Sequence, residues 1–192
     1  MKRKIILFLM FIFLSTVSFA PILKEQNINN VNIFNIYNEL KSKEIRQKQL
    51  NLFLNAIAYS ESRHNPEALN SGGYVGLFAF GQAARNATGY GHIKTSDFIK
   101  DPSIWEEQEQ ILAMTILLQK NGIHLYDYIK DTPFIFSKRK IVVTKSGLLA
   151  AAHLSGSGNV IRYLETKGLY NPKDKNGTSL EDYLIRFAGY NF

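Results

Sequence analysis

One helical face of apolar side chains ends in a carboxylate, and this pattern most constrains how the chain folds. The apolar positions recur at helical spacing, and they are Leu50, Phe53, Leu54 and Ile57. Glu61 takes the next position on the same face, and Pro66 follows where a helix can no longer continue. The pattern predicts a helix from about residue 41 to residue 60 whose end carries Glu61 toward a core or the floor of a cleft.

The position of Glu61 suggests acid chemistry. An ionised carboxylate is costly to bury, so a carboxyl group on an apolar face tends to keep its proton. A carboxylic acid that is protonated near neutrality is what a general acid requires. The simpler alternative is a glutamate at a helix end that turns aside into solvent.

Length and composition predict a globular protein with one principal domain. The chain has 192 residues, 45% hydrophobic and 12% aromatic, which is enough to bury one core. It contains no cysteine, so neither a disulfide framework nor a lipid attached at cysteine is expected. The net charge of +7 suits a polyanionic partner, while the short basic clusters argue against nucleic acid.

The first twenty residues have the pattern of a secretory signal peptide. Lys2, Arg3 and Lys4 precede a nearly unbroken apolar run over residues 5–14, and small residues follow at Ser18 and Ala20. Pro21 disfavours a cut after Ala20, so the alternatives are a cut after Ser18 and an uncleaved membrane anchor. An anchor is disfavoured because the run is shorter than the roughly 20 residues of a spanning helix. We therefore expect an exported protein of the periplasm or cell envelope. Residues 21–40 are interpreted as a leader or linker.

The rest of the chain, residues 41–192, predicts one all-α domain with at most a small hairpin or irregular insertion. Pro102 is typical of a helix start, residues 134–143 are the one β-like stretch, and residues 174–178 form a turn. Residues 146–154 are apolar nearly all round, which predicts a buried central helix. Further helices are expected over 75–87, 104–120, 159–167 and 179–187.

Three segments in series resemble the lysozyme-like fold of lytic transglycosylases and goose-type lysozymes. Residues 61–68 (ESRHNPEA) resemble the family's catalytic Glu-Ser and the Asn-Pro-x-Ala turn that follows. Residues 73–78 (GYVGLF) resemble its Gly-Leu-hydrophobic segment, and residues 151–156 (AAHLSG) resemble its Ala-Tyr-Asn-x-Gly motif. The resemblance covers about residues 45–165 and implies a lysozyme-like domain of a divergent subgroup.

The chain departs from the family pattern at three positions. Ala79 stands where the family usually has glutamine, so the nearest amide is Gln82. His153 stands where the family has a tyrosine, and Leu154 where it has an asparagine. A histidine can still exchange hydrogen bonds with a carboxylate, and we expect neutral His153 to lie within reach of Glu61. Packing in the core is the alternative for this side chain.

The resemblance implies cleavage of the β-1,4 bond between N-acetylmuramic acid and N-acetylglucosamine in peptidoglycan. Glu61 would act first as acid and then as base, and the product would be a 1,6-anhydro sugar. Many glycosidases need two carboxylates, and a lytic transglycosylase needs one. Asp97 and Glu67 are the nearby candidates for a second acid, although cap or turn roles fit both.

Further residues are candidates for binding the glycan. Aromatic side chains stack on sugar rings, glycines let the backbone approach a ligand, and polar side chains orient it; the candidates are Ser62, Tyr74, Gly76, Phe78, Phe80, Gln82, Tyr90, His153 and Gly156. For Phe78 and Phe80 an ordinary core role is equally open, and Ser62 can equally cap a turn.

Other chemistry has little support in the sequence. The four histidines, His64, His92, His124 and His153, lack metal-ligand spacing, so neither a metal nor another cofactor is expected. The predicted partner is the peptidoglycan strand, with membrane association through the N-terminal segment and an envelope or secretion protein of unknown identity as further options. A hydrolysing muramidase of the same fold and a non-catalytic peptidoglycan-binding scaffold remain alternatives to the transglycosylase.

Overall fold

The computed structural model describes residues 33–136 and 140–192, and the chain divides into two compact units, residues 1–43 and 44–192. The predicted signal segment and most of the predicted leader lie outside the described residues. Helix α2 (Ile33–Ser62) begins in the first unit and ends in the second. None of the helices in the described ranges is both long and apolar enough to cross a bilayer.

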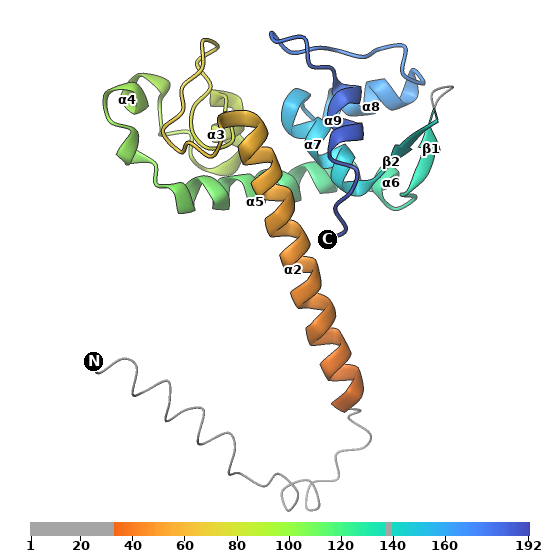
Figure 1. The fold of residues 1–192 in the computed structure, drawn as a ribbon. Helices are drawn as coiled ribbons and strands as arrows, with labels where there is room; N and C mark the ends of the chain where they lie inside the picture. Colours follow the sequence, from red (N-terminus) through yellow and green to blue (C-terminus); the bar gives the residue numbers. More distant parts are fainter. Residues whose placement is uncertain (1–32, 137–139) are drawn as a thin grey trace, which may run out of the picture. The chain divides into compact units, whose positions relative to one another are not determined.

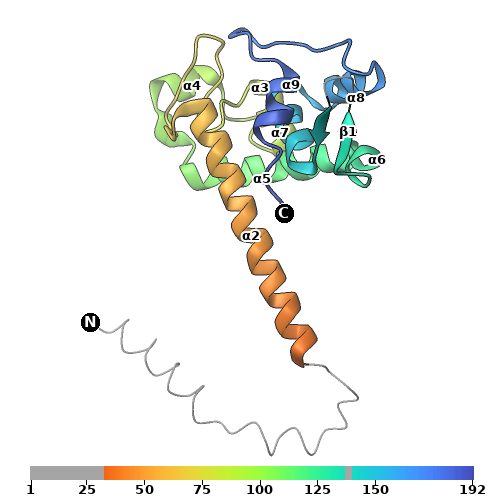
Figure 2. The same cartoon turned by 45° about the vertical axis from the view of Figure 1, so that its right-hand side comes forward.

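The second unit is mainly helical with one two-stranded antiparallel sheet, which confirms the predicted fold class. Its elements after α2 are α3 (Gln82–Thr88), α4 (Thr95–Lys100), a 3-10 turn η2 (Pro102–Ile104), α5 (Glu107–His124), α6 (Tyr126–Ile129), β1 (Phe134–Phe136), β2 (Ile141–Val143), α7 (Lys145–Ser155), α8 (Ser157–Glu165) and α9 (Leu180–Arg186). Within this unit α3 and α4 lie on one side and α8 with the hairpin on the other, while α5 contacts both α3 and α7 (Figures 1 and 2).

Helix α7 is the buried central helix that the sequence predicts. Every residue from 146 to 152 is buried. The helix packs closely against α9, and the two lie side by side in both views (Figures 1 and 2). A side chain at Gly147 would place its Cβ 2.6 Å from the backbone oxygen of Leu184, so glycine permits this approach. Ser146 Oγ donates to the Phe187 carbonyl at 2.6 Å and fixes the contact further.

The apolar face of α2 is buried as predicted over the part that belongs to the second unit. Phe53 and Ile57 are fully buried, and Leu54 nearly so. The Phe53 ring meets aromatic rings near the end of the chain, those of Phe187, Tyr190 and Phe192. Aromatic contacts between distant segments thus fix the part of α2 around Phe53 against the C-terminal segment.

Several predicted helices have different bounds in the structure, and α2 begins at Ile33 rather than near residue 41. The helix expected over 75–87 is confined to α3, because Gly76 and Ala79 adopt left-handed backbone angles that interrupt a right-handed helix. Helix α5 begins at Glu107 behind a capping box formed by Glu106 and Glu109, and it continues to His124. The short helices α4 and α6 were not predicted from the sequence pattern.

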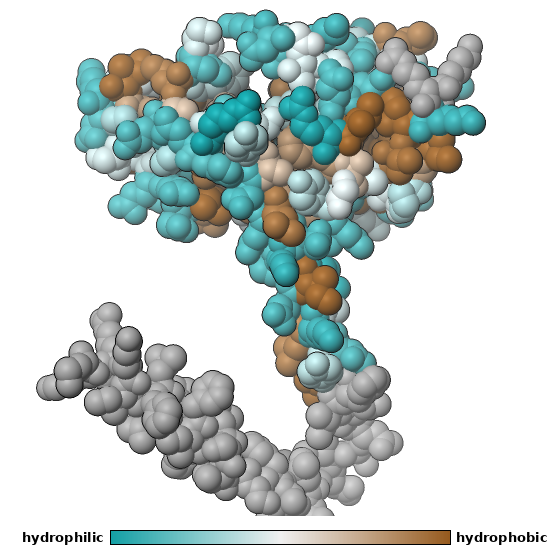
Figure 3. Space-filling model, in the orientation of Figure 1, coloured by the Kyte–Doolittle hydropathy of each residue, from teal (hydrophilic) through white to brown (hydrophobic). Residues whose placement is uncertain are grey.

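The two described ends of the stretch 134–143 are the paired antiparallel strands β1 and β2 rather than loop segments. Phe134 pairs with Val143, and Ile135 pairs with Val142. Ile135 and Val142 are exposed, and apolar surface lies beside the hairpin in Figure 3.

Candidate functional site

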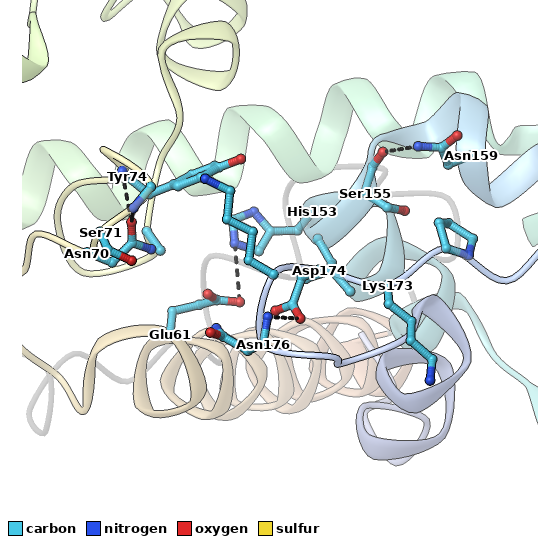
Figure 4. Close-up of a pocket in the computed structure, with 15 residues that line it drawn as sticks. Glu61, Asn70, Ser71, Tyr74, His153, Ser155, Asn159, Lys173, Asp174 and Asn176 are labelled. Atoms are coloured by element: carbon cyan, nitrogen blue, oxygen red, sulfur yellow. Dashed lines mark hydrogen bonds and ion pairs between the residues drawn. The ribbon is translucent and has the colours of Figure 1, made fainter.

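Glu61 lines a cavity of about 400 Å³ inside the second unit. One side is a loop wall, which we define as residues 65–95, and the other is a helical wall, which we define as α7–α9 with the segment 172–176. The lining side chains are mostly amides, hydroxyls and charged groups, and the lining residues are Glu61, Asn70, Ser71, Gly72, Tyr74, Ala79, His153, Leu154, Ser155, Asn159, Pro172, Lys173, Asp174, Lys175 and Asn176. Figure 4 shows Glu61 and His153 facing one another between Tyr74 and Ser155.

The Glu61 carboxylate is held by a tyrosine that the sequence analysis missed. Tyr183 of α9 donates its hydroxyl to Glu61 Oε1 at 2.5 Å. Among the residues the structure describes, none donates a hydrogen bond to Oε2, so this oxygen is available to a ligand. The Tyr183 side chain is buried beside a carboxylate, and its pKa is raised by the burial first and by the negative charge of Glu61 second. The phenol therefore stays protonated and remains a donor.

His153 contributes a second polar group beside the same oxygen. Its Nε2 lies 3.8 Å from Glu61 Oε1, which is beyond direct hydrogen-bond distance, and the side chain is 6% exposed against 15% for Glu61. Burial lowers the pKa of His153, while the Glu61 charge and the Phe78 backbone act more weakly in the opposite direction. The imidazole is thus neutral near pH 7. The neutral tautomer with its proton on Nε2 would direct an N–H toward the Glu61 carboxylate, which is the favourable orientation.

Ser62 fixes the end of α2 to the loop wall. Its hydroxyl lies 2.8 Å from the Leu77 carbonyl and 3.1 Å from the Ala58 carbonyl, and it accepts a hydrogen bond from the Asn65 amide. These contacts are all to backbone, and Ser62 is absent from the cavity lining. Ser62 therefore positions the turn that follows Glu61, which is the turn role left open by the sequence, and its role in ligand binding stays a prediction.

Gln110 of α5 is a second positioning group that sequence reasoning missed. Its buried side chain accepts from the Leu77 amide at 2.5 Å and donates to the carbonyls of Pro66 and Trp105 at 3.0 and 2.7 Å. A Cβ on Gly76 would collide with the same amide group, so the loop passes directly over it. Gly76 therefore serves close packing and a left-handed turn rather than lining the cavity.

Tyr74 is the aromatic side chain that reaches the cavity. It is 45% exposed, and its ring packs against two glycines, since a Cβ on Gly72 or Gly81 would lie 2.9 or 3.0 Å from ring atoms. The ring therefore lies close to the backbone on the loop wall. An exposed aromatic face of this kind can stack on a sugar ring.

Arg85 ties the more distant parts of the loop wall together. The buried guanidinium donates to the carbonyls of Phe80 and Ile93 at 2.6 and 2.9 Å, and to the side chains of Gln82 and Thr95 at 3.0 and 2.8 Å. Burial lowers the pKa of Arg85. Thr95 in turn donates to the Gly73 carbonyl, so the network extends to the residue before Tyr74.

Five other expected binding residues lie outside the cavity lining. The rings of Phe78 and Phe80 are fully buried, which assigns them to the core. Gln82 bonds Asn86, Gly91 and Arg85 within the loop wall, and the Tyr90 ring packs beside Trp105. Gly156 caps the C-terminal end of α7 with a left-handed φ of 85°.

The second carboxylate at the cavity is Asp174, not either acid that the sequence analysis singled out. Glu67 and Asp97 are absent from the lining. Asp174 lies in the turn over 174–178, and its Oδ1 accepts the backbone amides of Asn176 and Thr178 at 2.9 and 2.7 Å. Sequence reasoning identified this turn but had no signal to place it opposite Glu61.

The described residues contain no group of three acidic or histidine side chains arranged to hold a metal ion. Comparison with models of known protein families gives no match for this chain, and neither the curated proteins nor the solved structures give one.

Proposed function

We propose that this protein is a lytic transglycosylase that cleaves the β-1,4 bond between N-acetylmuramic acid and N-acetylglucosamine in peptidoglycan, with Glu61 as its acid and base. The observation that carries the proposal is a partly buried glutamate that lines a cavity and whose Oε1 is held by Tyr183, while no described residue donates a hydrogen bond to Oε2. The cavity is lined by amides, hydroxyls, charged groups and one exposed tyrosine. Such a lining matches a polymer of acetamido sugars, which offers hydroxyls, amides and ring faces.

The reaction needs one proton carrier. Protonated Glu61 gives its proton to the glycosidic oxygen as the C1–O bond breaks, and the substrate's acetamido oxygen bonds to C1 in its place. The resulting carboxylate then removes the proton from the 6-hydroxyl. That oxygen attacks C1, expels the acetamido oxygen and closes the 1,6-anhydro ring. Glu61 ends the cycle protonated, so no second protein acid is consumed.

The neighbours of Glu61 suit both halves of this cycle. Tyr183 donates to Oε1 whether or not Oε2 carries the proton, so it orients the carboxyl group without competing for the transferred proton. Neutral His153 adds a nearby dipole rather than a full positive charge, which would disfavour the protonated acid.

Replacing Glu61 tests the proposal. Glu61→Gln keeps the shape and removes the titrating group, so the rate of release of soluble fragments from purified peptidoglycan should fall by at least about 10²-fold. Mass spectrometry of the wild-type products should show the 1,6-anhydro mass. Glu67→Gln is the matched control, because Glu67 is exposed and outside the cavity lining. Retention of most activity by Glu61→Gln would refute the assignment.

Asp174 favours a hydrolysing muramidase as the second candidate. Two carboxylates at one cavity are the arrangement with which many glycosidases activate water. Products with an ordinary reducing end, 18 Da heavier than the anhydro form, would select this reaction. In that case Asp174→Asn should abolish cleavage as fully as Glu61→Gln does. A folded wild type that binds peptidoglycan and releases no product would select the third alternative, a binding scaffold.

A further inference from the structure

Lys175 is a cation at the cavity whose presence a neutral glycan does not explain. The side chain is exposed and belongs to the cavity lining. Within the described ranges, 33–136 and 140–192, it forms no ion pair. Sugar hydroxyls and acetamido groups carry no charge, so an ammonium group at this place fits an anionic substituent of the ligand.

The segment that carries Lys175 is built as a fixed turn. Asp174 accepts the amides of Asn176 and Thr178, and its own amide donates to the Thr178 carbonyl at 2.9 Å. Lys173 pairs with Ser179 in a β-bridge at the base of the turn. Asp174 lies between Lys173 and Lys175. Because its carboxylate bonds the backbone amides, the backbone that carries both lysines is held in one conformation.

The two lysines of this turn have different surroundings. Lys173 also lines the cavity, but Figure 4 shows its amine turned away from Glu61. Its charge acts on Asp182, whose pKa is lowered mainly by hydrogen bonds from Ser179 and further by Arg186 and Lys173. Lys173 therefore has an acidic neighbour within the protein, which makes it a natural control for Lys175.

We propose that Lys175 binds a carboxylate carried by the glycan, so that the site prefers anionic strands to neutral strands with the same backbone. The inference rests on the proposed function, in which every second sugar is a muramic acid. Its lactyl group ends in a carboxylate when free, and the peptide that is attached there in intact strands carries carboxylates of its own. Either source supplies the same chemistry to the ammonium group.

Binding to insoluble strands by the Glu61→Gln variant tests this without cleavage. The ligands are purified peptidoglycan, the same material with its carboxyl groups converted to amides, and material from which an amidase has removed the peptides. We expect amidation to weaken binding about twofold to fivefold, the range for an exposed ion pair, and high salt to reduce the difference. In the double variant Glu61→Gln with Lys175→Gln this difference should disappear. Lys173→Gln in the same background should keep it.

The outcomes separate the possible sources and the possible failures. The amidase frees the lactyl carboxylate as it removes the peptide, so Lys175-dependent binding to the stripped strands assigns the lactyl group. Lys175-dependent binding confined to intact strands assigns the peptide. Equal binding by the Lys175→Gln variant and its parent would overturn the proposal, as would an equal loss in Lys173→Gln. If the wild type releases no product but Glu61→Gln still shows Lys175-dependent binding, the cleavage proposal fails and the carboxylate site stands.

Discussion

The two walls of the cavity are held together in different ways. The loop wall has little regular structure, and buried polar side chains, those of Arg85 and Gln110, connect its backbone segments. The helical wall is held by close packing, most tightly where Gly147 of α7 meets Leu184 of α9. An irregular wall must satisfy its backbone groups one by one, whereas helices satisfy their own and need only complementary surfaces. We therefore expect the loop wall to be destabilised by the loss of hydrogen bonds and the helical wall by the loss of close packing.

Gln110→Leu should produce the largest loss, because it breaks the loop wall. It leaves the Leu77 amide and the carbonyls of Pro66 and Trp105 without their present partner, and we expect about 2–4 kcal/mol of unfolding free energy to be lost. Urea denaturation followed by circular dichroism measures it. Gln108→Leu on the exposed side of α5 is the control. A loss below about 1 kcal/mol would show that other groups hold this wall.

Gly147→Ala should break the helical wall through sterics alone. The added Cβ meets the rigid Leu184 backbone, so α9 must shift, at an expected cost of about 1–3 kcal/mol. Because α9 carries Tyr183, activity should fall as well. Gly158→Ala is the matched control, since nothing lies within 4 Å of its Cβ position in α8, and it should leave stability unchanged or slightly raised. Equal melting temperatures for the two variants would contradict this description.

Tyr183→Phe tests the contribution of the helical wall to Glu61 and keeps the ring in place. Loss of the hydroxyl removes the donor to Oε1, and we expect kcat to fall roughly tenfold, which corresponds to about 1.4 kcal/mol. The control is Tyr163→Phe, which removes a hydroxyl bonded to buried Glu181 on the same wall but away from the cavity lining. It should cost stability and not rate. A rate loss in both variants would point to general disturbance.

The smallest effect is a dependence of stability on pH that arises from His153. The buried imidazole has a pKa below the ordinary 6.5, so the native chain does not take up the proton that the unfolded chain binds. The free energy of unfolding is therefore highest above pH 6.5, where His153 is neutral in both states. It falls as the pH decreases from 6.5 toward the native pKa, because only the unfolded chain gains the proton. Between pH 7.5 and 5.5 the wild type should lose up to about 1.4 kcal/mol more than His153→Gln. If the unfolding free energies of the wild type and His153→Gln changed in parallel with pH, the burial of His153 would be contradicted.

The sequence predicted the helical parts of the site better than the irregular ones. Periodicity placed Glu61 at the end of a buried face, and a segment that is apolar nearly all round identified α7, because both signals lie in neighbouring residues. Tyr183 escaped notice, since its contact with Glu61 spans 122 positions and α9 is only seven residues long. The loop wall was mistaken for a helix over 75–81, because the left-handed angle at Ala79 has no compositional signal.

The packing of Tyr74 against two glycines also has a spectroscopic consequence. Gly72 lies at one edge of the phenol ring and Gly81 at the opposite edge, and each places an α-hydrogen where other residues have Cβ. The magnetic anisotropy of the ring should therefore displace the α-proton resonances of Gly72 and Gly81 from their usual positions. A sugar that settles on the exposed face would tilt the ring and move both signals together. Two glycines without any reactive group could in this way report, by NMR titration, when the neighbouring cavity is occupied.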